Sequence, residues 1–587
     1  MAGISGVWSP NGESGKEAIL PMLRPMTRSG RSCEVFSAED MHLGVRSSES
    51  CGFDDGNRIV AVDGEVYNKK ALCETSFSDD DSTERIVAQA YEEQGEDLFN
   101  ELAGDYALAL LDCDRSKLIL DTGLANNKNF FYSLMGSDLI FASELKGLMQ
   151  AGAIDPSIDR SSIGNLLTYG HVPAPFTLFE GLRRLPPGAT AITTEAGMTL
   201  VPAGEPRQYP PIEDLPAAVT SVEQSLKGAI NRRLSQSDDI GMMLSGGIDS
   251  ALLTSYLDEM VSGPVSTFTV GFGEDQQYAH SVSEHVGTDH SEKILSADEM
   301  IGQIPKVLWW REYPSKDPGV SPLYHIDSLT DRTELIWGQG AEEVVMGRQD
   351  YVALHALSSV PRRQAISRVF HDATPPVRNR SKLHRMYNLL RSRGPAESFT
   401  TFRDSGPKDR QNWAASDVHV GNTSRVRAPK NIHHPCSQYG WTSLINGFLS
   451  DVFPAPERRL MSPFLDSQVL DTGYRISSRL HLRDGRPRYL LRKLGAKRLP
   501  QQVTGRGRDS WASQTRNVVL NNSSILLAIA DRLQDRNIIT ESARTIVQRQ
   551  PHRWGKNLWT LVNLELFLEI FIDEDFEEEP PGIDYFI

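Results

Sequence analysis

Residues 241–253 read GMMLSGGIDSALL, a short apolar run followed by two adjacent glycines, two serines and an aspartate, and then by a second apolar run. The first run fits a buried strand and the second fits a helix, so we expect residues 245–250 to form the loop between them. Gly246 and Gly247 allow positive φ and close approach of the backbone, and the helix presents partial positive charge at its N-terminus. The stretch therefore predicts a site for a phosphate or pyrophosphate group.

Other phosphate-binding patterns do not describe this loop. The Walker pattern requires Gly-Lys-Ser/Thr and the dinucleotide fingerprint requires GxGxxG, and neither is present here. An ordinary glycine turn would explain two adjacent glycines, but not the order Ser-Gly-Gly-Ile-Asp-Ser at a strand-to-helix junction. We expect a nucleotide loop of another class.

The segments around this loop predict two domains of different class. Beyond residue 210, strand-like segments such as 266–272 (STFTVGF) and 334–340 (ELIWGQG) alternate with helical ones, which is typical of an α/β domain with a parallel sheet. Before residue 200, short strand-like runs such as 58–68 (RIVAVDGEVYN) are separated by turns and one helical stretch, which is an α+β pattern. A stretch rich in proline and glycine separates the two, so we predict domains 1–210 and 211–587.

Composition excludes several functional classes. The chain has 587 residues, enough for two cores, and its net charge of −16 argues against a nucleic-acid footprint or a membrane surface as partner. The five cysteines form no CxxC pair, and we find no signal peptide, so we expect reduced thiols and a cytoplasmic location. We expect the apolar stretch 558–572 to be a helix packed into the protein, and the acidic stretch 573–582 to be solvated.

The SGGIDS loop resembles the pyrophosphate loop of the asparagine synthetase and β-lactam synthetase superfamily. Similar patterns occur at 141–149 (FASELKGLM), 167–188 (LTYGHVPAPFTLFEGLRRLPPG), 338–347 (GQGAEEVVMG) and 461–471 (MSPFLDSQVLD), so the resemblance covers nearly the whole chain except its arginine-rich middle. It implies an α+β N-terminal Ntn-hydrolase-like αββα sandwich, here a degenerate glutamine amidotransferase-like domain. It also implies a following α/β ATP-pyrophosphatase domain, Rossmann-like with a parallel sheet.

The same resemblance implies ATP and Mg²⁺ as cofactors and assigns residues to them. Asp249 and Glu342 would ligate the metal, with Glu342 in place of a family aspartate. Arg508 would face the α-phosphate, although a surface arginine remains an alternative, and Glu312 is a candidate on the substrate side. Gln339 stands where asparagine synthetases have a glutamate and β-lactam synthetases a tyrosine, and a glutamine cannot act as a base. The residues expected to bind ATP are Leu244, Ser245, Gly246, Gly247, Asp249, Ser250, Val270 and Gly338.

The N-terminal domain lacks the residues that the resemblance assigns to glutamine hydrolysis. Ala2 stands where the family has a cysteine nucleophile, Asp63 replaces an oxyanion-hole asparagine, and Ser82 replaces a glutamine-binding aspartate, while Arg46 is retained. A carboxylate cannot donate a hydrogen bond to an oxyanion, so we expect this domain to have no glutaminase activity.

An adenylating domain without a glutaminase must take another amine. Members of the superfamily with this profile are the β-lactam and carbapenam synthetases and the lasso peptide cyclases, which join an N-terminal amine to an acidic side chain in a peptide. We favour the cyclase, with a peptide or small carboxylate as substrate and a leader-binding protein and a leader peptidase as partners. The segment around Arg378–Arg393 would bind the peptide or form a solvated helical face. The alternatives are an ammonia-dependent asparagine synthetase and a pseudoenzyme that binds nucleotide without chemistry.

Overall fold

The structure is a computed structural model. It describes residues 2–10, 15–26, 30, 32–47, 51–72, 81–124, 128–150, 152, 157–202, 210–235, 239–273, 276–347, 351–352, 355, 458–506, 511–541, 545, 551–574, 576 and 578–587. Arg508 and the segment Arg378–Arg393 lie outside the described residues, so the predictions made for them stay predictions.

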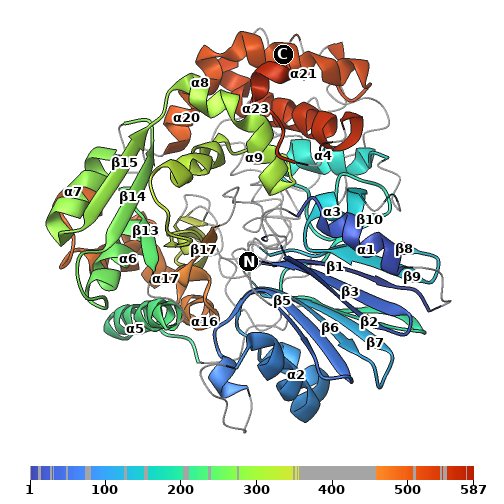
Figure 1. Ribbon diagram of the computed structural model, residues 1–587. Coiled ribbons are helices and arrows are strands. Elements are labelled where there is room, and N and C mark those ends of the chain that lie inside the picture. The colour runs from blue at the N-terminus through green and yellow to red at the C-terminus, as the bar shows by residue number, and fades with distance from the viewer. Residues whose placement is uncertain are drawn as a thin grey trace, which may run out of the picture.

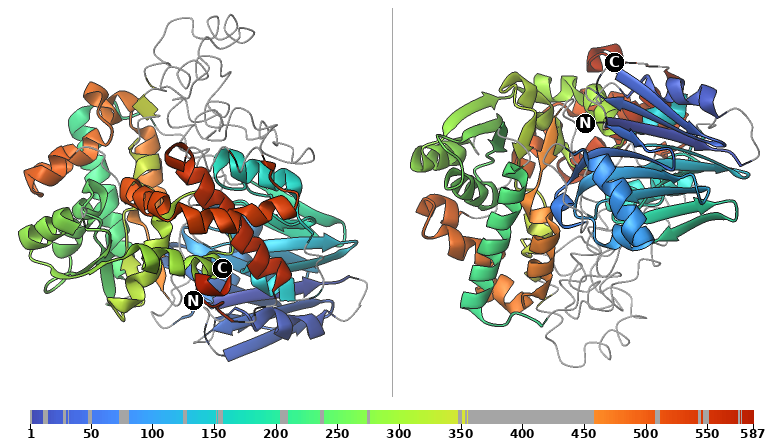
Figure 2. Two further views of the ribbon diagram at one scale, coloured as in Figure 1. Left: turned by 90° about the horizontal axis from the view of Figure 1, so that it is seen from above. Right: turned by 60° about the horizontal axis from the view of Figure 1, so that its bottom comes forward.

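The N-terminal half is built on two six-stranded antiparallel sheets that face each other (Figure 1). Apolar side chains such as Ile4, Leu43 and Ala109 alternate inward along their strands and fill the core between the sheets. Helices α1 (Lys16–Leu23) and α3 (Leu145–Gln150) pack against the first sheet, and α2 (Thr83–Gln94) covers the outer face of the second (Figure 2). This layering agrees with the predicted αββα sandwich. In spatial order, the first sheet holds β10 (Leu182–Arg184), β8 (Phe131–Met135), β9 (Asp138–Ala142), β1 (Ala2–Trp8), β3 (Met41–Ser47) and β2 (Ser32–Ala38), and the second holds β12 (Gly197–Val201), β11 (Thr190–Thr194), β7 (Lys117–Thr122), β6 (Gly104–Asp112), β5 (Arg58–Val66) and β4 (Gly52–Asp54).

The second half is built on a five-stranded sheet in which every pair is parallel. Helices α5 (Leu215–Leu234), α6 (Ile248–Asp258) and α18 (Tyr489–Gly495) share an apolar core on one face, and the 3₁₀ segment η4 (Pro318–Ser328) packs on the other. Burial on both faces explains the apolar runs that predicted the three central strands. In spatial order the strands are β15 (Asp289–Ile294), β14 (Ser266–Gly271), β13 (Ile240–Met243), β16 (Glu334–Ile336) and β17 (Arg459–Met461).

A third core joins the two halves. Helices α20 (Trp511–Asn521), α21 (Ser523–Asp535) and α23 (Pro551–Leu568) run between them at the top of Figure 1. Of these, α23 packs on α9 (Ile304–Arg311) and α4 (Arg160–Tyr169). In this core, Trp309 stacks on Phe571 with ring centroids 5.8 Å apart. The prediction that 558–572 is a packed helix is therefore confirmed. The predicted boundary near residue 210 stays a prediction, because residues 203–209 lie outside the described part.

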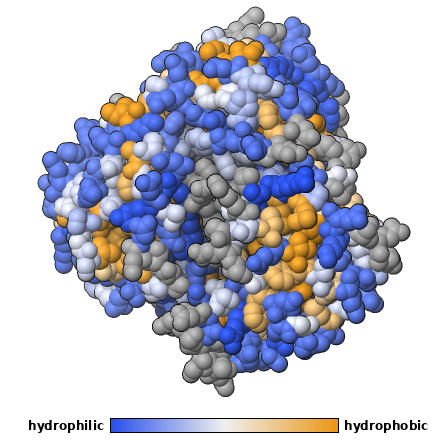
Figure 3. Space-filling view, in the orientation of Figure 1, coloured by the Kyte–Doolittle hydropathy of each residue, from blue (hydrophilic) through white to orange (hydrophobic). Residues whose placement is uncertain are grey.

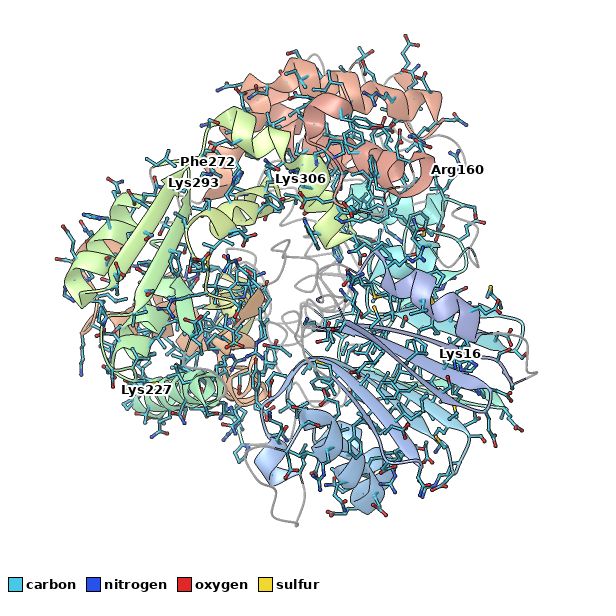
Figure 4. The ribbon with its side chains drawn as sticks, viewed as in Figure 1. Lys16, Arg160, Lys227, Phe272, Lys293 and Lys306 are labelled. Carbon is cyan, nitrogen blue, oxygen red and sulfur yellow. The ribbon has the colours of Figure 1, made fainter. Side chains whose placement is uncertain are left out.

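The prediction of a solvated acidic tail is wrong in part. Glu579 accepts hydrogen bonds from the indole of Trp310 and, at 2.8 Å, from the hydroxyl of Tyr324. Its carboxylate also lies 3.1 Å from the ammonium of Lys306 on α9, the helix on which Figure 4 labels this lysine. Ile583 is buried beyond it, so apolar side chains anchor the tail to the protein. No helix in the described ranges is both long and apolar enough to cross a bilayer. The face in Figure 3 is mostly hydrophilic, with an apolar area over the sandwich.

Candidate active site

The glycine loop joins β13 to α6 at the carboxyl end of the sheet's middle strand. The helix begins at Ile248, earlier than the sequence predicts, and this places Asp249 and Ser250 in its first turn. Only Gly246 uses the positive φ that the glycines allow, with φ +67°, whereas Gly247 has φ −81°. The loop is closed by contact between the hydroxyls of Ser245 and Ser250, whose oxygens lie 2.9 Å apart.

A cavity of about 650 Å³ opens beside this loop. It is lined where β13, β14 and β16 end, and β14 and β16 flank β13 on opposite sides, which is the crevice where open parallel sheets bind ligands. Its volume lies in the range of small-molecule and cofactor sites. Of the eight residues predicted to bind ATP, seven line the cavity: Leu244, Ser245, Gly247, Asp249, Ser250, Val270 and Gly338.

Two carboxylates in the cavity share one cation. A guanidinium nitrogen of Arg488 lies 3.1 Å from Asp249 Oδ2 and 2.7 Å from Glu342 Oε1. Burial disfavours the charged form of Arg488, but Asp249, Glu342 and Glu343 outweigh it and raise the pKa of the guanidinium. The two carboxylates are thus close enough to hold a single ion, which fits magnesium bound by one or two carboxylates together with phosphate oxygens.

Further arginines make the cavity electropositive. Arg486 and Arg492 line it, and so does Arg506, whose guanidinium lies 3.9 Å from the ring centroid of Tyr278. With Arg488, the described lining residues carry four guanidinium groups against two carboxylates, a net charge of +2. A positively charged cavity complements a negatively charged polyphosphate, and each guanidinium group can donate two parallel hydrogen bonds to phosphate oxygens.

Comparison with known sequences shows the family of the chain. The sequence profile described as asparagine synthase matches residues 221–569, more than half of the chain. The chain belongs to the asparagine synthase family. The profile described as a glutamine amidotransferase domain matches residues 1–203 of the same chain.

Full-length relatives of this asparagine synthase family member are distant in sequence. Glutamine-hydrolyzing asparagine synthetase 1 of Bacillus subtilis (strain 168) is 24% identical over 588 residues, which covers 92% of this chain and 90% of the relative. A putative glutamine-hydrolyzing asparagine synthetase of Mycobacterium tuberculosis (strain ATCC 25618 / H37Rv) is 24% identical over 88% of this chain and 85% of the relative. The solved allosteric regulatory enzyme of purine biosynthesis overlaps 50% of this chain and 80% of its own with 12% identity and a TM-score of 0.27, and we draw nothing from so low a likeness.

The amidotransferase-like half of this family member holds an ion pair at its altered positions. Asp63 is buried and accepts a hydrogen bond of 3.0 Å from the backbone amide of Ala2, and its carboxylate lies 2.7 Å from Lys128. Ser82 caps α2 by accepting from the backbone of Arg85, so its hydroxyl serves the helix. Arg46 donates to three backbone carbonyls, including that of Gly30 at 2.7 Å. The arrangement therefore presents an acceptor to Ala2 where an oxyanion site requires a donor.

The structure does not bring Glu312 to the cavity, contrary to its expected place on the substrate side. Its carboxylate lies between the two halves, where it accepts from the backbone amides of Leu145 at 2.7 Å and Lys146 at 3.0 Å, and from the Lys146 ammonium at 3.2 Å. Burial raises the pKa of Glu312, and Lys146 opposes the shift. The carboxylate caps the N-terminus of α3, and because Glu312 directly follows α9, these hydrogen bonds connect α9 to the sandwich. We therefore assign Glu312 a structural role.

Two further predicted residues line the cavity, and two residues that contact predicted ones were not predicted. Glu342 and Gln339 both line the cavity, and the backbone carbonyl of Gln339 accepts from the hydroxyl of Ser462. Sequence reasoning missed Lys128 and Arg488, both of which pair with carboxylates that it singled out. The segment 485–492 (GRPRYLLR) carried a usable signal for Arg488, because three arginines follow a glycine turn there.

Proposed function

We propose that this chain is an ATP-dependent ligase that forms an amide by adenylating a carboxylate and passing the acyl group to an amine. The carboxylate pair Asp249 and Glu342 carries this proposal, because both carboxylates contact the guanidinium of Arg488 next to the glycine loop. These two residues would hold magnesium, which supplies positive charge to phosphate oxygens when bound. Mg²⁺ and ATP are thus the proposed cofactors.

The chain's own groups support the chemistry around that pair. Backbone amides at the start of α6 and the cavity arginines would hold the phosphate groups and oppose the negative charge that develops at the α-phosphate. Apolar walls from Phe268, Val270 and Trp337 would cover the adenosine and exclude water. Protection from water favours attack by an amine over hydrolysis of the acyl adenylate.

The amine would not come from glutamine hydrolysed in the N-terminal half. Ala2 offers no nucleophile, and Asp63 is a buried acceptor already paired with Lys128. We infer that this half is a structural partner of the synthetase half, to which Glu312 and the third core attach it.

The substrate we favour is a peptide that carries both reacting groups, as in ring closure of a lasso peptide precursor. Ala2 and the acceptor Asp63 support it, because a chain that makes no ammonia would need an intramolecular amine, which requires no ammonia source. Holding both groups in one site is worth up to about 7 to 11 kcal/mol of the barrier. A leader-binding protein and a leader peptidase would be the partners, and neither nucleic acid nor membrane is expected.

A second candidate is ammonia-dependent asparagine formation, since the relatives named above are asparagine synthetases. A β-lactam or carbapenam-type product is a further small-molecule alternative. In each case a carboxylate is adenylated, so the alternatives share the first half-reaction and differ in the product.

The test of adenylation is exchange of labelled pyrophosphate into ATP in the presence of a candidate carboxylate. Asp249→Asn should abolish exchange, whereas Asp258→Asn, at the other end of the same helix and away from the cavity, should leave it unchanged. Normal exchange by Asp249→Asn would contradict the assignment. Tight nucleotide binding without exchange for any tested carboxylate would favour the pseudoenzyme.

A further inference from the structure

The guanidinium of Arg488 lies between the two carboxylates that line the cavity in the described part of the chain. It contacts Asp249 Oδ2 at 3.1 Å and Glu342 Oε1 at 2.7 Å through one nitrogen, Nη2. A divalent ion bound by the same two oxygens would have to lie where this nitrogen lies. Arg488 and a metal ion therefore compete for one position.

The surrounding backbone is shaped to place Arg488 there. Its φ of +59° lies in the left-handed region, which a side chain other than glycine rarely adopts. Gly347 gives the guanidinium room, since a Cβ at that residue would lie 2.9 Å from Arg488 Nε and 2.9 Å from Glu342 Cα. A strained residue facing a glycine is typical of a constraint tied to a site.

This inference rests on the proposed function: we propose that Arg488 is a positioning residue that excludes free divalent metal ions from Asp249 and Glu342. The exclusion ends when phosphate groups bind the guanidinium and replace the two carboxylates as its partners. Magnesium then enters only together with a phosphate ligand. Between binding events, Arg488 keeps the two carboxylates close together by neutralising part of their mutual repulsion.

Phosphate is the ligand class that can release this contact. Its oxygens accept two parallel hydrogen bonds from a guanidinium, as a carboxylate does, and they bring negative charge that offsets the incoming metal. A metal ion alone brings two positive charges next to the fixed guanidinium, and this repulsion lowers its affinity. The proposal thus predicts strong coupling between metal binding and phosphate binding.

The experiment measures Mn²⁺ binding to the full chain by the electron paramagnetic resonance signal of free Mn²⁺, with and without inorganic pyrophosphate. The proteins are wild type, Arg488→Gln, and the control Arg483→Gln, which removes the same charge from an exposed residue five positions earlier that does not line the cavity. We expect Arg488→Gln to bind Mn²⁺ alone at least about tenfold more tightly than wild type does. Arg483→Gln should resemble wild type, and pyrophosphate should tighten Mn²⁺ binding to wild type much more than to Arg488→Gln.

Two results would overturn the proposal. One is that wild type binds Mn²⁺ alone as tightly as Arg488→Gln does. The other is that Arg483→Gln binds Mn²⁺ alone as tightly as Arg488→Gln does, which would assign the effect to net charge. If no protein binds Mn²⁺ even with pyrophosphate, the metal site of the proposed function fails, and this inference fails with it. If Arg488→Gln does not fold, Arg488→Met serves instead, because it also removes the guanidinium charge and should give the same gain in Mn²⁺ affinity.

Discussion

Replacing Arg233 by methionine should destabilise the protein more than any change at the neighbouring arginine. Arg233 lies on α5 and is fully buried, with its guanidinium 3.1 Å from Asp466 and 3.8 Å from Asp105. It also donates to the backbone carbonyl of Ser462 at 3.0 Å and lies 4.4 Å from the ring centroid of Tyr67. One side chain thus ties the sandwich to the segment after β17.

The magnitude follows from the carboxylates left behind. Removing one partner of a buried ion pair costs about 3 to 5 kcal/mol, because the remaining charge is uncompensated. After the substitution, Asp466 still has Arg232 as a partner at 2.6 Å. Asp105 then has only the hydrogen bond from the Tyr67 hydroxyl and more distant charges. We therefore expect most of the loss to come from Asp105. Arg232→Met should cost less, since Arg232 is partly exposed and Asp466 keeps Arg233.

The assay is urea unfolding followed by circular dichroism at about pH 8 and about pH 5. Burial raises the folded pKa of Asp105, and Arg233 opposes that shift. Without Arg233 the folded pKa of Asp105 rises further, so Asp105 becomes protonated in the folded state as pH falls. The loss of unfolding free energy caused by the substitution should therefore be smaller at about pH 5 than at about pH 8. A loss below about 1 kcal/mol at pH 8, or a loss that grows on acidification, would refute this reasoning.

Three further predictions concern glutamine, pH and the residues outside the described part. Ala2→Cys alone should not produce ammonia from glutamine, because Asp63 still presents an acceptor, and glutamine-dependent ammonia release above background would contradict this. The folded pKa of Asp121 is raised to about 7 by burial, partly offset by hydrogen bonds from Thr190 and Tyr106, so its contribution to stability is present at low pH and is lost between about pH 4 and 7. Asp121→Asn should flatten that part of the stability profile in urea melts, and an unchanged slope would argue against the shift. Arg508→Ala should slow pyrophosphate exchange, whereas charge reversals in 378–393 should mainly raise the peptide KM.

Much of the fold follows from local sequence pattern. The run 58–68 predicted β5, and 241–244 predicted β13, because buried strands require continuous or alternating apolar residues. The loop between β13 and α6 was predictable for the same reason, since strand, glycines and helix follow one another within a few residues. Val270, near the end of the predicted strand 266–272, also lines the cavity as expected.

Tertiary contacts set the limit of that prediction. The arginines of 485–492 mark Arg488 as a candidate for anion binding, but its contact with Asp249 and Glu342 depends on a left-handed residue and on space left by Gly347, which no local pattern predicts. Glu312 was a candidate on the substrate side, but its position directly after α9 directs its carboxylate to Leu145 and Lys146. Residue type and spacing identify chemistry, whereas the direction of each side chain is fixed by packing.

The most direct measurement is mass spectrometry of a short precursor peptide, encoded next to this protein's gene, after incubation with ATP, Mg²⁺ and the purified chain. A cyclising ligase should convert the peptide to a product one water lighter and release one AMP and one pyrophosphate per product, without glutamine or ammonium. Asp249→Asn should leave the peptide unchanged. A peptide of unchanged mass, together with asparagine formed from aspartate and ammonium by the same preparation, would contradict ring closure and identify an ammonia-dependent asparagine synthetase.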